Sequence, residues 1–454
     1  MRLTRRQAVA GAGAAALGGA GIYELVDRLT QAPERPKVLK LPPEQHVLEG
    51  VRLVRDNGVE VLVPPLHHEV VTVRVATADL KRAQHDLEAA LADLDRRYEP
   101  TPAGLGVTVA WGLPYFRRHV RASIATKFLP RDLRARTAAL LDARRFPSDP
   151  AETVLEENDA AVLLRSDKLD HVRDAHGRLF DELDVFEVTS VRRGFAGGGF
   201  DGDRSLPKQM AVAAGVPGAD LIPDTAELFL GFTSTQRANL GPPRIANFET
   251  LGYVVTPGGY FRGGTHMHLS HIEEDLEAWY LNFSFQEQVD TVFKPGLRVK
   301  RGTQTVAQGA AQVATEHAIQ RDYRRRGTIG HSQAIQPASR LQADHLGEDG
   351  TLYKKGTAIP QRADFNTLDN PFAFPLVPGA QPIAGVHFVV FNPTSDDFNR
   401  GRLAMDGRLP SGVKLPFQPR SRGQGFNSVL RTTHRQNFLV PPRLHRSFPL
   451  VELA

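Results

Sequence analysis

The order of strand-like and helix-like segments is the feature that most constrains the fold of this chain. "EVVTVRVA" places Val71, Val73 and Val75 on one face of a strand, and "DLKRAQHDLEAALADLDRRY" then sets Leu80, Ala83, Leu87, Leu91 and Leu94 on one helical stripe. "GVTVAWGLPYF" predicts a second strand, and "AAVLLRSDKLDHVRDAHGRLF" predicts a third strand and another helix. Strand, helix, strand, strand, helix is the order of a ferredoxin-like α+β unit.

The later part of the chain repeats this plan. "GGTHMHLSHI" predicts a strand that runs into a helix with Ile272, Leu276, Trp279 and Phe283 at helical spacing, and "AGVHFVVFNP" predicts a late strand. We therefore expect an α+β protein of two ferredoxin-like halves, packed as one unit of the dimeric α+β barrel type. The expected divisions are a signal segment over 1–30, a lead-in over 31–65, a first half over 66–215 and a second half over 216–454, with a long insertion from Lys294 to Arg326.

The first thirty residues predict export. In "TRRQAVAGAGAAALGGAGIY" the paired Arg5 and Arg6 precede an Ala/Gly-rich run without charges up to Glu24, which is typical of a twin-arginine signal. No later stretch is apolar for about twenty residues. We expect a protein exported to the cell envelope or the medium, with the signal either cleaved, which we favour, or kept as a weak membrane anchor.

Composition limits the chemistry that the chain can carry. Its 454 residues include no cysteine, which excludes disulfides, iron–sulfur clusters, thiolate-bound haem and cysteine-based zinc sites. The twin-arginine route carries folded proteins, and this favours a cofactor loaded before export. The net charge of +5 comes from scattered arginines without a basic block, so we expect no nucleic-acid partner.

Three histidines stand close together in "GGTHMHLSHIEEDLEAWY". His266 and His268 share one face of the predicted strand, and His271 lies near the predicted helix start. Two histidines on one face can chelate a metal, but a closed site needs three or four ligands. A solvent-facing polar strand is the alternative interpretation, and Glu273 and Glu274 then belong to the first turn of the helix.

Several segments together resemble one family, the dye-decolorising peroxidases. The resemblance runs from about Val70 to Pro442 and rests on the shared order of "GVTVAWGLPYF", "LFLGFTSTQRANL", "GGTHMHLSHIEEDLEAWY", "IGHSQAIQPASR", "TLYKKGTAIP", "GVHFVVFN" and "NFLVPP". Members of that family are haem enzymes built from two ferredoxin-like halves. The resemblance therefore implies haem b, hydrogen peroxide and a reducing substrate.

Residue by residue, the resemblance places His331, followed by Pro337, at the axial ligand of the haem iron. It places Gly231, Phe232 and Ser234 in the loop where the family has G-F-x-D-G, so that Ser234 stands where the catalytic Asp would be. Lys354, with Lys355 beside it, stands at the distal arginine and keeps the charge without the forked donor geometry. A competing placement puts Asp201 of "GFDGD" at the carboxylate, although this loop also fits a flexible surface turn.

The altered distal positions leave more than one function open. One of His266 and His268 could supply the acid–base group that Ser234 cannot, because an imidazole titrates near neutral pH. The leading prediction is a peroxide-dependent oxidation of a reductant that the sequence does not identify. The alternatives are a haem or small-ligand binding protein without peroxidase activity, and a cofactor-free scaffold with a histidine metal site. Trp279 and Tyr280 fit core aromatics better than radical carriers, and a homo-oligomer stays open.

Overall fold

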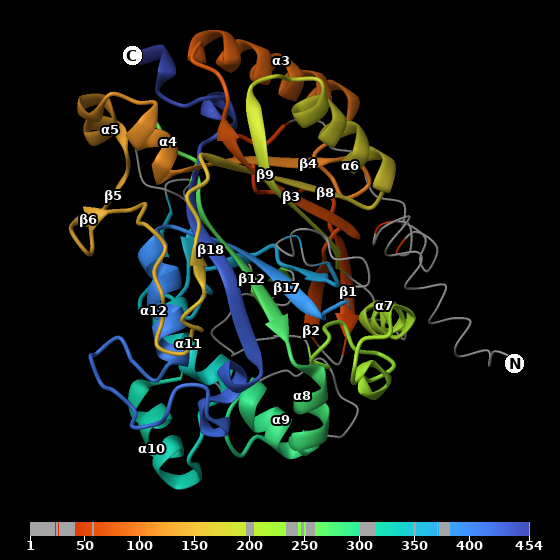
Figure 1. Ribbon diagram of the computed structural model, residues 1–454. Coiled ribbons are helices and arrows are strands. Elements are labelled where there is room, and N and C mark those ends of the chain that lie inside the picture. The colour runs from red at the N-terminus through yellow and green to blue at the C-terminus, as the bar shows by residue number, and fades with distance from the viewer. Residues whose placement is uncertain are drawn as a thin grey trace, which may run out of the picture.

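The computed structural model describes residues 41–56, 59–196, 204–232, 244–246, 249–250, 259–299, 314–347, 351–369, 371 and 382–453, with residues 23 and 26. Its two main layers of helices lie above and below a central set of strands (Figure 1). Among the described residues no helix is both long enough and apolar enough to cross a membrane.

The first half has the predicted order of elements. They are β3 (His67–Val75), α3 (Leu80–Arg97), β4 (Gly106–Gly112), β8 (Ala160–Ser166), α6 (Leu169–His176) and β9 (Phe186–Phe195). The strands lie side by side as β9-β3-β8-β4, with every pair antiparallel. The two middle strands are thus the first and third in the chain, which is the ferredoxin-like arrangement. Both α3 and α6 cover one face of it (Figure 1).

The second half repeats that strand order. Its strands are β12 (Thr265–Glu274), β15 (Gln361–Arg362), β16 (Phe365–Thr367), β17 (Gly385–Asn392) and β18 (Leu430–Val440). β12 pairs with β18 on one side and with β17 on the other, and β15 and β16 pair with the far edge of β17. The sequence prediction of an α+β fold with two ferredoxin-like halves is confirmed.

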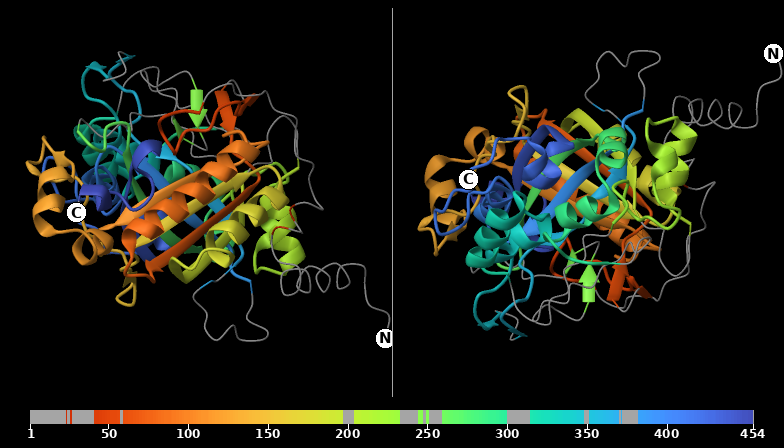
Figure 2. Two further views of the ribbon diagram at one scale, coloured as in Figure 1. Left: turned by 90° about the horizontal axis from the view of Figure 1, so that it is seen from above. Right: turned by 90° about the horizontal axis from the view of Figure 1, so that it is seen from below.

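Helices lie on the outer side of this second sheet, either directly against the strands or behind other helices. They are α8 (Leu276–Asn282), α9 (Phe285–Val292), α10 (Glu316–Arg326), α11 (His331–Ser339) and α12 (Ser395–Met405), and Figure 2 shows some of them from below, in front of the strands. The insertion expected between Lys294 and Arg326 contains α10, and its residues 300–313 lie outside the described part.

The two sheets join into one closed ring of strands. β4 pairs with β18 through Trp111 and Leu439, and β9 pairs with β16 through Phe195 and Asn366. Because side chains alternate along a strand, one face of each strand points into the ring and the other points to the helices. The inward face carries an apolar cluster formed by Val70, Ala110, Ala161, Leu163, Ala196, Met267, Leu269, Ala363, Phe365, Val389, Phe391, Phe438 and Val440.

Smaller elements surround the ring. β1 (Arg52–Asp56), β2 (Val59–Val63), β10 (Arg244–Ala246) and β11 (Glu249–Thr250) form a separate four-stranded sheet, and β7 (Val154–Leu155) pairs with β18. α4 (Leu113–Arg118) and α5 (Ala122–Phe128) follow β4, and α7 (Leu206–Ala214) follows the first half. Tyr23, within the predicted signal segment, is buried, and its hydroxyl donates to the carbonyl of His68 at 2.8 Å.

Closure of the ring requires glycine at position 194. A Cβ there would lie 2.1 Å from the carbonyl oxygen of Asn366, at the junction of β9 and β16. We therefore expect Gly194→Ala to lower the free energy of unfolding by about 1–3 kcal/mol. In α12, a Cβ at Gly401 would meet nothing within 4 Å. Because glycine inside a helix is destabilising relative to alanine, Gly401→Ala should raise the free energy of unfolding by about 0.5–1 kcal/mol. Urea unfolding followed by tryptophan fluorescence measures both, and equal stability of the two variants would contradict this account of the junction.

Candidate functional site

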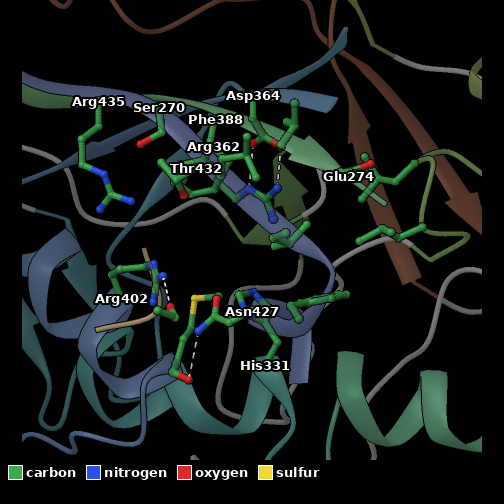
Figure 3. Close-up of a pocket in the computed structure, with 18 of the residues that line it drawn as sticks. Ser270, Glu274, His331, Arg362, Asp364, Phe388, Arg402, Asn427, Thr432 and Arg435 are labelled. Atoms are coloured by element: carbon green, nitrogen blue, oxygen red, sulfur yellow. Dashed lines mark hydrogen bonds and ion pairs between the residues drawn. The ribbon is translucent and has the colours of Figure 1, made fainter. Parts of the chain in front are cut away.

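A cavity lies between the outer face of the second sheet and the helices that cover it. The space between its lining residues is about 1050 Å³, and part of this space is open to solvent. Figure 3 shows strand residues such as Arg362, Asp364 and Ser270 on one side and His331 and Arg402 on the helical side. Much of its wall is apolar and is formed by Leu228, Leu230, Phe232, Ile272, Val292, Val386, Phe388, Phe398, Met405, Phe426 and Leu430.

His331 is the first residue of α11 and lines this cavity. Gly330 precedes it because a Cβ there would lie 2.4 Å from the carbonyl oxygen of Phe293, so only glycine lets α11 start so close to the end of α9. Among the described residues, His331 makes no hydrogen bond, and its buried Nδ1 has no partner. Burial, with Arg362 and Arg402 nearby, lowers the pKa of His331 to about 3, and the imidazole is neutral at pH 7.

Arg362 and Asp364 form an ion pair on the strand side of the cavity. Arg362 ends β15, and its Nε and Nη2 donate to the two carboxylate oxygens of Asp364 at 2.7 and 2.5 Å. Asp364 is completely buried. This two-point contact fixes the plane of the guanidinium. Sequence reasoning missed the three arginines that line the cavity, Arg362, Arg402 and Arg435. For Arg362 the signal was the Arg-x-Asp spacing, which puts both side chains on one face of the chain.

A second charged cluster joins α12 to β18. Arg402 and Arg435 both contact Oδ1 of Asp149, at 3.3 and 2.7 Å, and Arg402 also contacts Asp406 at 3.0 Å. The pairing of β12 with β18 shifts register at Thr433, so that this strand carries one extra residue. This bulge explains why Thr432 and Arg435, three residues apart, both line the cavity.

Glu274 also lines the cavity, and here the structure corrects the sequence prediction. Glu273 and Glu274 end β12 and do not belong to the first turn of a helix; α8 begins at Leu276, with Asp275 as its N-cap. Glu273 pairs with Arg431 at 3.0 Å. Oε2 of Glu274 is buried without a hydrogen-bond partner in the described part of the chain. Burial, assisted by the charge of Asp364, raises the pKa of Glu274 to about 8.

The residues predicted for the distal loop are only partly described. Gly231 has φ +88°, a left-handed conformation that favours glycine, and Phe232 after it lines the cavity. Ser234 and the competing Asp201 both lie outside the described residues.

Lys354 lies elsewhere. Its side chain is 67% exposed, its Nζ contacts Asp344 at 3.1 Å, and it does not line the cavity of His331. The structure therefore gives Lys354 and the neighbouring Lys355 no contact with this site, and the cations on the strand side of the cavity are Arg362 and Arg435.

His266 and His268 are buried, which contradicts the interpretation of a solvent-facing strand. Nδ1 of His266 lies 2.7 Å from the carbonyl oxygen of Pro393. His268 lies 2.6 Å from Asn437 and, through Nε2, 2.6 Å from Oγ of Ser270, and its ring stacks on Phe398. Neither histidine lines the cavity, although Ser270 does. Burial lowers the pKa of His266 to about 4 and that of His268 well below its usual range.

His271 points to the other face of the same strand. It lies in β12, and not near the start of a helix as expected, and its ring is 4.9 Å from that of His387. Within the described residues, no group of three or more His, Asp or Glu side chains is arranged to hold a metal ion. Trp279 is completely buried and donates to the carbonyl oxygen of Leu230 at 2.9 Å, as a core residue does.

Comparison with solved structures finds dye-decolorising and DyP-type proteins. The chain is similar to a DyP-type peroxidase from Cellulomonas bogoriensis, with 16% identity, a TM-score of 0.49 and coverage of 88% of this chain and 96% of that one. An encapsulated DyP-type peroxidase from Mycobacterium smegmatis is 13% identical, with a TM-score of 0.47 and coverage of 85% of this chain and 95% of that one. A dye-decolorizing protein from V. cholerae is 14% identical, with a TM-score of 0.46 and coverage of 85% of this chain and 96% of that one.

Comparison by sequence finds one family model. No curated protein matches the chain. A family model does match, over residues 65–442, which span both ferredoxin-like halves and the cavity between strands and helices. The chain therefore belongs to the family described as DUF7405, a family of unknown function.

Proposed function

We propose that this chain is an exported haem-binding protein that uses hydrogen peroxide to oxidise a reducing substrate. The observation that carries the proposal is His331, a neutral imidazole without a hydrogen bond among the described residues, on the wall of a largely apolar cavity opposite Arg362 (Figure 3). The ordered sequence motifs from Val70 to Pro442 support the same assignment.

The residues of the cavity fit haem b. A metal ligand must be unprotonated, and His331 is neutral at pH 7. A flat macrocycle needs apolar walls, which Phe232, Phe388 and Phe426 help to supply. The chain has no cysteine, which leaves histidine, tyrosine and methionine as axial ligands, and of these we propose His331. When bound, haem would supply the redox-active iron for the reaction with peroxide.

The residues of the chain have separate roles in this proposal. His331 holds the cofactor from the start of α11. Arg362, oriented by Asp364, presents a fixed cation to an anionic oxygen in the cavity, where exclusion of water strengthens the attraction. Arg402 and Arg435 add positive charge that Asp149 partly neutralises.

Haem ligation by His331 can be tested by absorption spectroscopy. We expect protein purified from a haem-supplemented host to show a Soret band that His331→Ala loses or shifts. His85→Ala, at an exposed position of α3, is the matched control and should keep the wild-type spectrum. A wild-type protein without the band after addition of hemin would contradict haem binding, and an unchanged band in His331→Ala would contradict the ligand.

One observation favours a second function, that of a haem carrier or sensor. A haem-ligating histidine usually donates its other ring nitrogen to a carboxylate or carbonyl, and no described residue accepts from His331. Peroxide consumption by the haem-loaded protein separates the two functions.

For the peroxidase we expect Arg362→Lys to lower the rate of peroxide consumption by about 10²–10³-fold, because lysine cannot keep the two-point contact with Asp364. Arg117→Lys, at an exposed arginine that makes the same kind of contact with Asp142, is the control and should leave the rate unchanged. No peroxide consumption by the loaded wild-type protein would leave the carrier as the function.

Export by the twin-arginine route is part of the proposal and rests on Arg5 and Arg6. We expect the double variant Arg5→Lys/Arg6→Lys to accumulate inside the cell, while Arg2→Lys is exported like the wild type. Immunoblots of cell fractions measure this, and equal export of the double variant would refute the signal.

A further inference from the structure

The acidic residues that line the cavity differ in whether an arginine pairs with them. Three acidic residues line it. Asp364 is held by Arg362, and Asp149 is held by Arg402 and Arg435. Glu274 makes no ion pair or hydrogen bond through its buried Oε2 with any described residue. Burial of a carboxylate oxygen without a partner disfavours the charged form, so such a group tends to keep its proton.

The position of Glu274 gives it access to the ligand space. It is the last residue of β12 and shares the outward face of that strand with Ser270 and Ile272, which also line the cavity. Figure 3 shows Glu274 on the side of the cavity where the Arg362–Asp364 pair lies.

Burial is the main cause of the raised pKa of Glu274, and the groups that face it add to this effect. Asp364 repels a negative charge on it, and the positive charge of Arg362 is already compensated by Asp364. Tyr280 of α8 is close enough for its own pKa to respond to Glu274, but its hydroxyl donates to the carbonyl of Phe229 at 2.6 Å. The cavity thus contains three arginines and one carboxyl group that is protonated at pH 7 and loses its proton as the pH rises through about 8.

We propose that Glu274 holds the exchangeable proton of this cavity and donates it to an oxygen anion bound beside the arginines. A hydroperoxide anion accepts the proton, so that the carboxylic acid becomes a carboxylate and the anion becomes hydrogen peroxide; the reverse step draws a proton from hydrogen peroxide. The choice of peroxide as the ligand rests on the proposed function. Glu274 then supplies the acid–base group that the sequence prediction sought in His266 or His268, neither of which lines the cavity.

The proton on Glu274 can be observed without haem. Protein labelled with ¹³C at the glutamate carboxyl carbons is titrated by NMR. We expect one carboxyl resonance with a midpoint near pH 8 that is absent from Glu274→Gln and unchanged in Glu273→Gln, the same substitution at the neighbouring residue, which pairs with Arg431. Gln is an isostere of protonated Glu, so the variant should fold. A resonance that persists in Glu274→Gln, or no glutamate midpoint above about 6, would overturn the inference.

Donation to an anion has its own test, with formate as a redox-inert oxygen anion. A bound anion that accepts a hydrogen bond from the carboxylic acid of Glu274 stabilises its protonated form, so tenfold excess of formate over its Kd should move the midpoint upward by about one pH unit. An unmoved midpoint would overturn the donor role. A protein that passes both tests but shows no Soret band would support this inference and refute the haem proposal, so the two failures are distinguishable.

Discussion

The closure of the two sheets into one ring is the constraint on which the rest of the structure depends. Two short junctions, β4 with β18 and β9 with β16, join two ferredoxin-like halves that each have the same strand order. Once the ring is closed, one face of each strand is committed to its interior. The outward face of β12, β17 and β18 must then be covered by helices, and α11 and α12 leave the cavity beneath them. The position of His331 therefore follows from the architecture.

Within the cavity, the arrangement of buried charge decides which groups can act. Arg362, Arg402 and Arg435 are fixed by Asp364 and Asp149, so their guanidinium groups are oriented before any ligand arrives. Burial, with the charges of Arg362 and Arg402, lowers the pKa of His331 to about 3 and keeps the imidazole neutral. No described residue pairs with Oε2 of Glu274, and burial together with the charge of Asp364 raises the pKa of Glu274 to about 8. A neutral imidazole, fixed cations and one protonated acid form a site suited to a metal-bound cofactor with an anionic oxygen ligand.

The sequence predicted the periodic parts of this structure and missed those set by tertiary contacts. Alternating valines and the leucine stripe predicted β3 and α3, and the repeated order predicted both halves. The assignment of Glu274 to a helix was wrong because a capping residue follows it, and β12 extends up to that cap. Lys354 was placed by motif order alone, whereas Arg362 lies at the cavity because β15 pairs with β17. No sequence pattern shows that Asp149, in a loop of the first half, meets Arg435.

A crystal structure of the protein purified with haem tests the central claim most directly, because it shows both the ligand and its place. The account predicts haem in the cavity between the second sheet and α11, with its iron bound by the imidazole of His331 and Arg362 on the opposite side. Haem bound at the surface, or iron held by a residue other than His331, would contradict it.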